Sequence, residues 1–225
     1  MAYEVIAFVL KDTVPNESIE PILKDYILDF IVSESGVQKA YWGMEIENPR
    51  KAHIFVYWDS IEAHEELQKK DYYLPFIQKL STITDMTQIH AFHTHVLPHP
   101  ADQVLHEETS PVTELFTAYF PKDYSEAKQR QYVKRLETLV ANGKPEGATQ
   151  SPIKGYSGGW AVEDLMVPGT DEKGMAFLAI FGWESVEKHR EFTETEAFKR
   201  NRYLIDEVEG LRHRDVVHFT GRRIK

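Results

Sequence analysis

Two stretches of the chain read almost alike. Residues 53–67 are HIFVYWDSIEAHEEL and residues 177–192 are FLAIFGWESVEKHREF. An offset of 125 residues aligns Trp58 with Trp183 and His64 with His189. Each copy has an apolar run, a Trp-acid-Ser step and then Ile/Val-Glu-x-His, which is typical of a strand that leads into a helix capped by serine. The chain therefore contains one strand-to-helix unit twice.

The same spacing continues beyond these stretches. His93 and His218 are also separated by 125 residues, each near the end of its half. A spacing that persists over so long a segment predicts two related halves of ordinary domain size. We expect a first half over residues 1–97, a polar, proline-bracketed linker over residues 98–111 and a second half over residues 112–225.

Each half is expected to follow the order β-α-β-β-α-β. In the first half the predicted elements are a strand over 3–11, a helix over 19–34, strands over 37–47 and 52–58, a broken helix from Ser60 to about residue 80, and a strand over 87–97. In the second they are a strand over 112–120, a helix over 125–142, strands over 160–165 and 176–183, a broken helix over 184–208 and a strand over 214–220. The glycine-rich residues 155–159 read as a flexible connection.

This order predicts an α+β fold made of two ferredoxin-like repeats. One repeat carries its helices on one face of the sheet and leaves the other face bare. Two repeats in one chain could bury the bare faces on each other, so we expect a pseudo-dimeric α+β barrel within one chain. The tandem chain could in turn form a homodimer.

Composition limits the function. Hydrophobic residues make up 42% and charged residues 28%, as in ordinary globular proteins. The sequence has no cysteine, so disulfides and thiolate chemistry are excluded. A net charge of −10 argues against nucleic-acid binding. No apolar run approaches the roughly 20 residues of a membrane span, and no targeting signal is evident, so we expect no membrane partner and a cytoplasmic location.

The residues around the repeat resemble the dimeric α+β barrel superfamily in a tandem-fused form. Its antibiotic-biosynthesis-monooxygenase (ABM) domain and stress-responsive branches are the most similar. The resemblance is carried by Tyr41-Trp42-Gly43 and residues 53–64, and by their echoes Gly159-Trp160 and residues 183–189. It implies the barrel fold and a family that includes cofactor-independent oxygenases, polyketide cyclases and haem-degrading oxygenases.

At the positions that two groups of these relatives use for catalysis or haem binding, this chain has other residues. The cyclase relatives carry a Tyr and a His on the helix after the third strand, whereas the matching positions here are Leu67 and Tyr73, then Phe192 and Phe198. The haem-degrading relatives use a helix His in a segment that has none here, over residues 72–80. The resemblance therefore disfavours haem, and we expect no cofactor.

Four histidines related by the repeat are the candidates for catalysis. They are His64, His93, His189 and His218, and an imidazole titrates near neutral pH. His93 and His95 share one face of a strand, but a His-x-His pair without a third ligand is a weak metal signal, so no metal site is predicted. The alternative is that these histidines make structural hydrogen bonds.

Aromatic side chains are the candidates for substrate binding, because flat rings stack on flat ligands. We select Tyr41, Trp42, Tyr57, Tyr73 and Trp160. Trp58 and Trp183 are better explained as core. Each of Tyr41 and Tyr57 precedes a tryptophan and should face the opposite side of the sheet.

These features predict a cofactor-independent small-molecule enzyme, of monooxygenase or cyclase type, that acts on an aromatic or polyketide-like compound. Oxygenation, cyclisation and decarboxylation all remain open. The alternative is a non-catalytic ligand-binding or stress-response barrel. The halves have diverged, which suggests that at most one keeps a working pocket, and the denser histidines slightly favour the first. Nucleotide and serine-hydrolase motifs are absent from the sequence.

Overall fold

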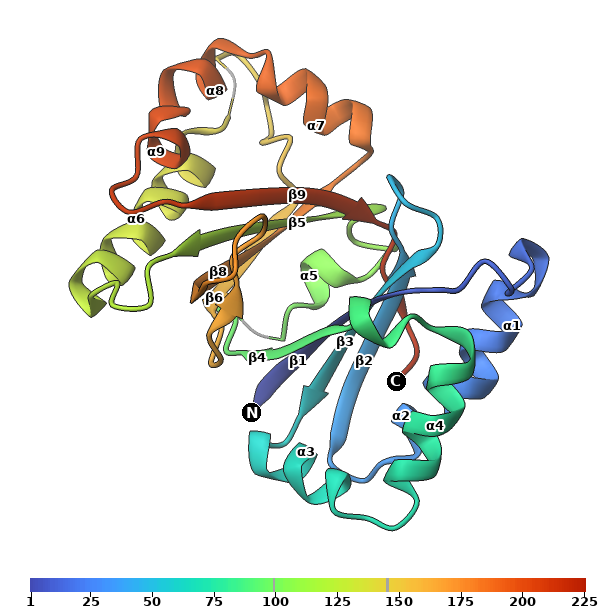
Figure 1. Cartoon of the computed structure of the whole chain (residues 1–225). Helices are drawn as coiled ribbons and strands as arrows, with labels where there is room; N and C mark the ends of the chain where they lie inside the picture. The colour runs from blue at the N-terminus through green and yellow to red at the C-terminus, as the bar shows by residue number, and fades with distance from the viewer. Residues whose placement is uncertain (99, 145) are drawn as a thin grey trace. The chain divides into compact units, whose positions relative to one another are not determined.

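A computed structural model describes residues 1–98, 100–144 and 146–225. It divides the chain into two compact units (Figure 1). The first unit comprises Met1–His95 with Phe219–Lys225, and the second comprises Val96–His218. None of the helices within the described ranges has both the length and the apolarity needed to cross a membrane.

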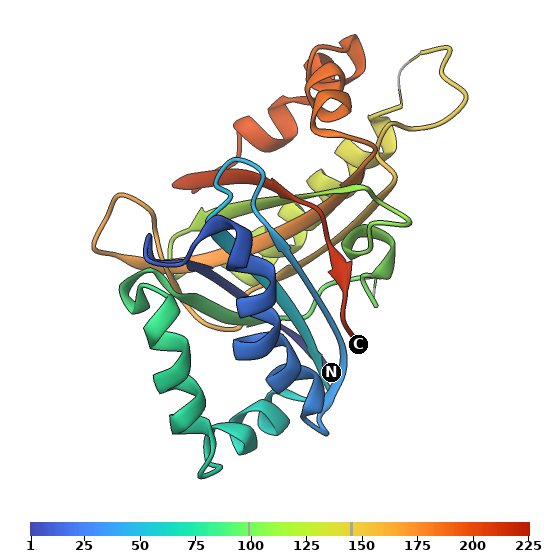
Figure 2. The same cartoon turned by 90° about the vertical axis from the view of Figure 1, so that its right-hand side faces the viewer.

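The first unit is built on a five-stranded sheet in the order β10-β2-β3-β1-β4. Its strands are β1 (Ala2–Val9), β2 (Val37–Met44), β3 (Lys51–Trp58), β4 (His90–Thr94) and the short β10 (Arg222–Arg223). Its helices are α1 (Ile19–Leu23) and α2 (Asp29–Ser33), joined by a π-helical turn, then α3 (Ile61–Gln68) and α4 (Tyr73–Ile83). Helices α1, α2 and α4 lie along one face of this sheet (Figure 2), where Trp42, Ile54 and Trp58 join their apolar cluster.

The second unit repeats this plan. Its strands are β5 (Val112–Phe120), β6 (Gly155–Trp160), β7 (Leu165–Met166), β8 (Lys173–Trp183) and β9 (His213–Phe219), in the order β6-β8-β5-β9 with β7 beside β8. Its helices are α5 (Asp102–Leu105), α6 (Glu126–Asn142), α7 (Val186–Thr193), α8 (Glu196–Asn201) and α9 (Tyr203–Asp206). The predicted fold class, mixed α+β with two antiparallel sheets, is confirmed. Closure of the sheets into one barrel stays a prediction.

The glycine-rich residues before Trp160 are a strand, and the predictions of a flexible connection there and of a strand over residues 160–165 were wrong. Residues Gly155–Trp160 form β6, which pairs antiparallel with β8. A Cβ at Gly158 would lie 2.7 Å from Tyr156 Oη and 2.8 Å from the Phe177 ring, closer than packed atoms tolerate. Glycine is therefore needed here for close packing, not for flexibility.

The predicted linker contains structured residues. Helix α5 lies within it, and Val104 and Leu105 are fully buried. Ser110 Oγ donates a hydrogen bond to Gln103 O at 2.7 Å, which ties the segment together. His99, also part of the predicted linker, lies outside the described residues. The described part of residues 98–111 is thus packed into the second unit.

Candidate functional site

A cluster of four polar side chains occurs once in each unit. The first tetrad is Glu4 on β1, Trp58 on β3, His64 on α3 and His93 on β4. Trp58 Nε1 donates to Glu4 Oε2 at 2.9 Å, and His64 Nδ1 lies 2.9 Å from His93 Nε2. His64 Nε2 is 3.5 Å from Glu4 Oε1. All four side chains are buried.

The second tetrad is Glu114 on β5, Trp183 on β8, His189 on α7 and His218 on β9. Trp183 Nε1 donates to Glu114 Oε2 at 2.6 Å, and His189 Nδ1 lies 2.8 Å from His218 Nε2. The same Nδ1 is 3.5 Å from Glu114 Oε2. The structure therefore brings the four predicted histidines together as two pairs, His64 with His93 and His189 with His218.

Local sequence explains how the second tetrad assembles. Val112 pairs with Trp183 across β5 and β8, so Glu114 stands two residues along on the same sheet face as Trp183. Ser185 caps α7 by accepting a hydrogen bond from Lys188 N at 3.2 Å. The cap starts the helix so that the His189 ring, one turn later, stacks on Trp183 with ring centroids 4.7 Å apart. The first unit repeats each step with its own residues.

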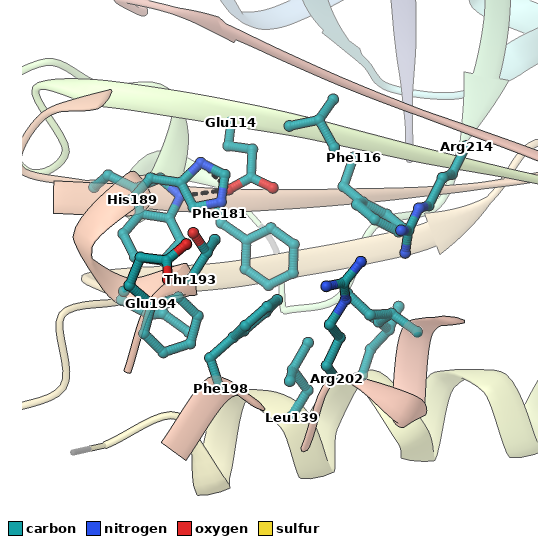
Figure 3. Close-up of a pocket in the computed structure, with 16 residues that line it drawn as sticks. Glu114, Phe116, Leu139, Phe181, His189, Thr193, Glu194, Phe198, Arg202 and Arg214 are labelled. Carbon is teal, nitrogen blue, oxygen red and sulfur yellow. Dashed lines mark hydrogen bonds and ion pairs between the residues drawn. The ribbon is translucent and has the colours of Figure 1, made fainter. Parts of the chain in front are cut away.

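A pocket of about 410 Å³ lies beside the second tetrad, between the sheet and helices α6 to α9 (Figure 3). This volume is in the range of small-molecule sites. Five aromatic rings contribute to its walls, those of Phe116, Phe181, Trp183, Phe192 and Phe198. Glu114 and His189 lie toward one end and the guanidinium groups of Arg202 and Arg214 toward another (Figure 3).

Burial makes Glu114 an unusual acid. Loss of solvent around its carboxyl raises the pKa of Glu114 to about 8, and the hydrogen bond from Trp183 opposes this rise without cancelling it. At pH 7 the side chain is therefore mostly a neutral carboxylic acid. A group with a pKa near the working pH can both give and take a proton, which suits acid–base catalysis.

The second tetrad also has the composition of a metal site. Ligand atoms of Glu114, His189 and His218 all lie within 4.8 Å of one another. Two histidines and one carboxylate form a donor set that divalent iron and related metals accept. Here, however, the two histidines share a hydrogen bond and Trp183 donates to the carboxyl. The donors satisfy one another, and a metal ion would have to break these contacts.

The first tetrad lies in a different setting. His64 Nε2 is 3.2 Å from Gln68 Nε2, whose position is taken by the smaller Thr193 in the second unit. Side chains of α4 pack beneath the first sheet, including Tyr73, Phe76 and Ile77. The two hollows described on the first unit are not lined by any member of the first tetrad. The pocket thus favours the second unit, whereas histidine density slightly favoured the first half.

Three of the predicted substrate-binding residues lie on strands of the first unit. Tyr41 is fully buried and, with Tyr57, faces away from the helices; the Tyr57 ring stacks on Tyr3 at 4.7 Å. Trp42 faces the helices and lines a hollow of about 480 Å³, with the Arg222 guanidinium 5.7 Å from its ring.

The other two lie in apolar clusters. The Tyr73 ring centroid is 6.0 Å from that of Phe76 in the first unit, and the Trp160 centroid is 5.2 Å from that of Phe177 in the second. None of the five predicted aromatic residues lines the pocket beside Glu114. Their role in substrate binding stays a prediction.

Sequence reasoning missed Glu114, Arg202 and Arg214. A signal existed for Glu114: an acid is the third residue of the first strand in both halves, and it is the single charged residue in AYEVIAFV and in VTELFTAYF. A charged residue repeated at the same place in two buried strands indicates a paired or functional group. The arginines give no such signal, since each reads as an ordinary exposed cation.

No protein-family model and no curated protein matches the sequence. Solved structures are similar over nearly the whole chain. An anthrone oxidase-like protein shares 14% identity with a TM-score of 0.65, covering 99% of this chain and 92% of its own. A proposed monooxygenase from Lactobacillus acidophilus shares 13% identity with a TM-score of 0.57, and the match covers 98% of this chain and 93% of that protein. A proposed monooxygenase from Fusobacterium nucleatum shares 11% identity with a TM-score of 0.56, and the match covers 98% of this chain and 91% of that protein.

Identities this low carry information about the fold alone. The chain therefore has the fold of these monooxygenase and anthrone oxidase-like structures, and the resemblance seen in the sequence is confirmed at the level of the α+β fold.

Proposed function

We propose that the chain is a small-molecule enzyme of the cofactor-independent monooxygenase type, with its active site in the pocket of the second unit. The observation that carries this proposal is the position of Glu114 and His189 in the pocket wall. A buried acid with a pKa of about 8 beside an imidazole is an acid–base pair suited to neutral pH. The names of the similar structures, monooxygenase and anthrone oxidase-like protein, support the same reaction type.

The pocket walls favour an aromatic substrate. Five aromatic side chains border a space of about 410 Å³, enough for a compound of two or three fused rings. Stacking of a flat ligand on such rings contributes about 0.5–1.5 kcal/mol for each ring pair beyond area burial. A polyketide-derived phenol or anthrone-type compound has this shape.

Catalysis would begin with proton removal. His189 takes a proton from an acidic C–H or O–H of the substrate, and His218, at 2.8 Å, shares the positive charge. The electron-rich anion then adds to molecular oxygen. Glu114, protonated at neutral pH, gives its proton to the peroxide, and loss of water from that hydroperoxide converts a CH₂ group into a carbonyl. The same base could instead start a cyclisation.

One observation favours the non-catalytic alternative. The same tetrad occurs in the first unit, where the two hollows described do not touch it, so the cluster also has a structural use in tying strand to helix. If this were its whole role, matched changes in the two tetrads would have equal effects.

Oxygen uptake with a panel of anthrones and polyhydroxylated naphthalenes tests the proposal. We expect turnover by the wild type, a loss of at least about 100-fold in His189→Gln, and little change in the matched control His64→Gln. Product analysis by mass spectrometry separates oxygenation from cyclisation. Equal activity of the two variants, or no turnover of any panel member by wild type, would refute the assignment.

A further inference from the structure

Two arginines meet at one end of the pocket. Arg202, between α8 and α9, and Arg214, on β9, both line it. Each forms an ion pair with Asp206 on α9: Arg202 Nε donates to Oδ2 and Arg214 Nη1 donates to Oδ1. Asp206 is not among the residues that line the pocket, so it holds the two guanidinium groups from outside. The three side chains together carry a net charge of +1.

Most of the guanidinium donors remain available to a ligand. A guanidinium has five N–H groups, and in the described part of the chain Asp206 engages one from each arginine. Figure 3 shows both guanidinium groups close together, at the opposite side of the pocket from His189. Glu194 also lines the pocket, but its side chain is 79% exposed and lies 3.4 Å from Lys199 Nζ.

Comparison of the two units links this arginine pair to the pocket. The offset of 125 residues places Ile77 and Ile89 where the second unit has Arg202 and Arg214, and Ser81 where it has Asp206. The first unit therefore has no counterpart of the triad formed by Arg202, Asp206 and Arg214, and its tetrad borders neither described hollow. The whole chain has a net charge of −10, so the positive charge at this end of the pocket is opposite in sign to the charge of the whole chain.

We infer that the pocket takes an aromatic carboxylate, bound by its acid group to Arg202 and Arg214. A planar carboxylate matches the fork of guanidinium donors and balances the single positive charge of the triad. The rings then extend between the phenylalanine walls toward His189 and Glu114. The inference rests on the proposed function for the reaction at that end, whereas the binding step stands independently of it.

Binding of a matched pair of probes tests this inference without turnover. The probes are anthraquinone-2-carboxylate and anthraquinone-2-carboxamide, which differ in charge and little in shape, and the readout is calorimetry at two salt concentrations. We expect wild type to prefer the carboxylate by about tenfold or more, since hydrogen bonds to charged groups are strong but this site is partly exposed. The preference should shrink as salt rises.

Variants separate the arginine pair from general surface charge. Arg202→Gln and Arg214→Gln should each reduce the preference for the carboxylate severalfold while leaving amide binding unchanged. The control is Arg212→Gln, an arginine outside the pocket that pairs with Glu172 and should leave the preference intact. No preference in wild type, or an equal loss in Arg212→Gln, would overturn the inference. The wild-type comparison needs no variant and so stands even if one fails to fold.

Failure of this inference can be told from failure of the proposed function. Tight carboxylate binding that depends on both arginines, together with no turnover of any aromatic acid, would support the binding site and refute the enzyme. Turnover of neutral phenols with no preference for the carboxylate would refute carboxylate binding by Arg202 and Arg214 and would still support the proposed enzyme activity.

Discussion

Glu114→Gln should change the pH dependence of stability. Burial raises the pKa of Glu114 from an ordinary value of 4.5 to about 8 in the folded protein. Between these values the unfolded chain has released the proton while the folded chain still holds it, so stability falls as pH rises through this window. At about 1.4 kcal/mol for each pH unit, the total loss is on the order of 5 kcal/mol and is complete above pH 8.

Glutamine keeps the acceptor for Trp183 Nε1 but cannot ionise. The variant should therefore match wild type near pH 4.5 and exceed its stability by several kcal/mol at pH 8. Urea unfolding at pH 5, 6, 7 and 8, followed by tryptophan fluorescence, measures the two profiles. The control is Glu194→Gln. The Glu194 side chain is 79% exposed, so its replacement should leave the wild-type change of stability with pH unaltered. Parallel profiles of Glu114→Gln and wild type would refute the reasoning.

Three further predictions follow from local contacts. Ser185→Ala removes the cap of α7 and should cost about 1 kcal/mol, seen as a lower thermal midpoint; an unchanged midpoint would contradict the capping role. Gly158→Ala places a Cβ 2.7 Å from Tyr156 Oη and should lower the free energy of unfolding in urea by about 1–3 kcal/mol. An unchanged free energy of unfolding would contradict this packing role. A chelator should leave turnover unchanged because the donors of the second tetrad satisfy one another; activity lost to the chelator and restored by ferrous iron would reverse that assignment.

The strand, cap and helix around Trp58 and Trp183 were predictable because their signals are local. An apolar run, a serine and a helical pattern lie within a few residues, and the structure buries both tryptophans and uses Ser60 and Ser185 as caps. The repeat of this unit then implied the α+β fold. Local chemistry and its duplication were enough to predict the mixed α+β fold class.

The residues of β6 were misread because their strand depends on a distant partner. Glycines such as Gly158 lower strand propensity, and only the pairing with β8 and the ring of Phe177 explain their conformation. The pocket was hidden for the same reason. Glu114, Arg202 and Arg214 come from β5, the α8–α9 junction and β9, and tertiary structure alone brings them to one space.

The two tetrads share their internal contacts but differ in their surroundings. Both units stack a histidine on the tryptophan, at 5.1 Å for Trp58 and His64 and 4.7 Å for Trp183 and His189. The surroundings differ, with Gln68 beside the first tetrad and Thr193 lining the pocket beside the second. Sequence repetition could identify the shared cluster but could not indicate which copy borders a cavity.

Turnover by Glu114→Gln beside Glu4→Gln tests the central claim most directly. The two changes remove the equivalent carboxyl from each tetrad, and the first should stabilise the fold at pH 8, so a loss of activity there would not arise from unfolding. Oxygen uptake at pH 7 and 8, with the anthrone or naphthol of the panel that the wild type turns over fastest, is the measurement. We predict a loss of about 100-fold or more in Glu114→Gln and a rate within about twofold of wild type in Glu4→Gln. Equal rates in the two variants would contradict an active site in the second unit.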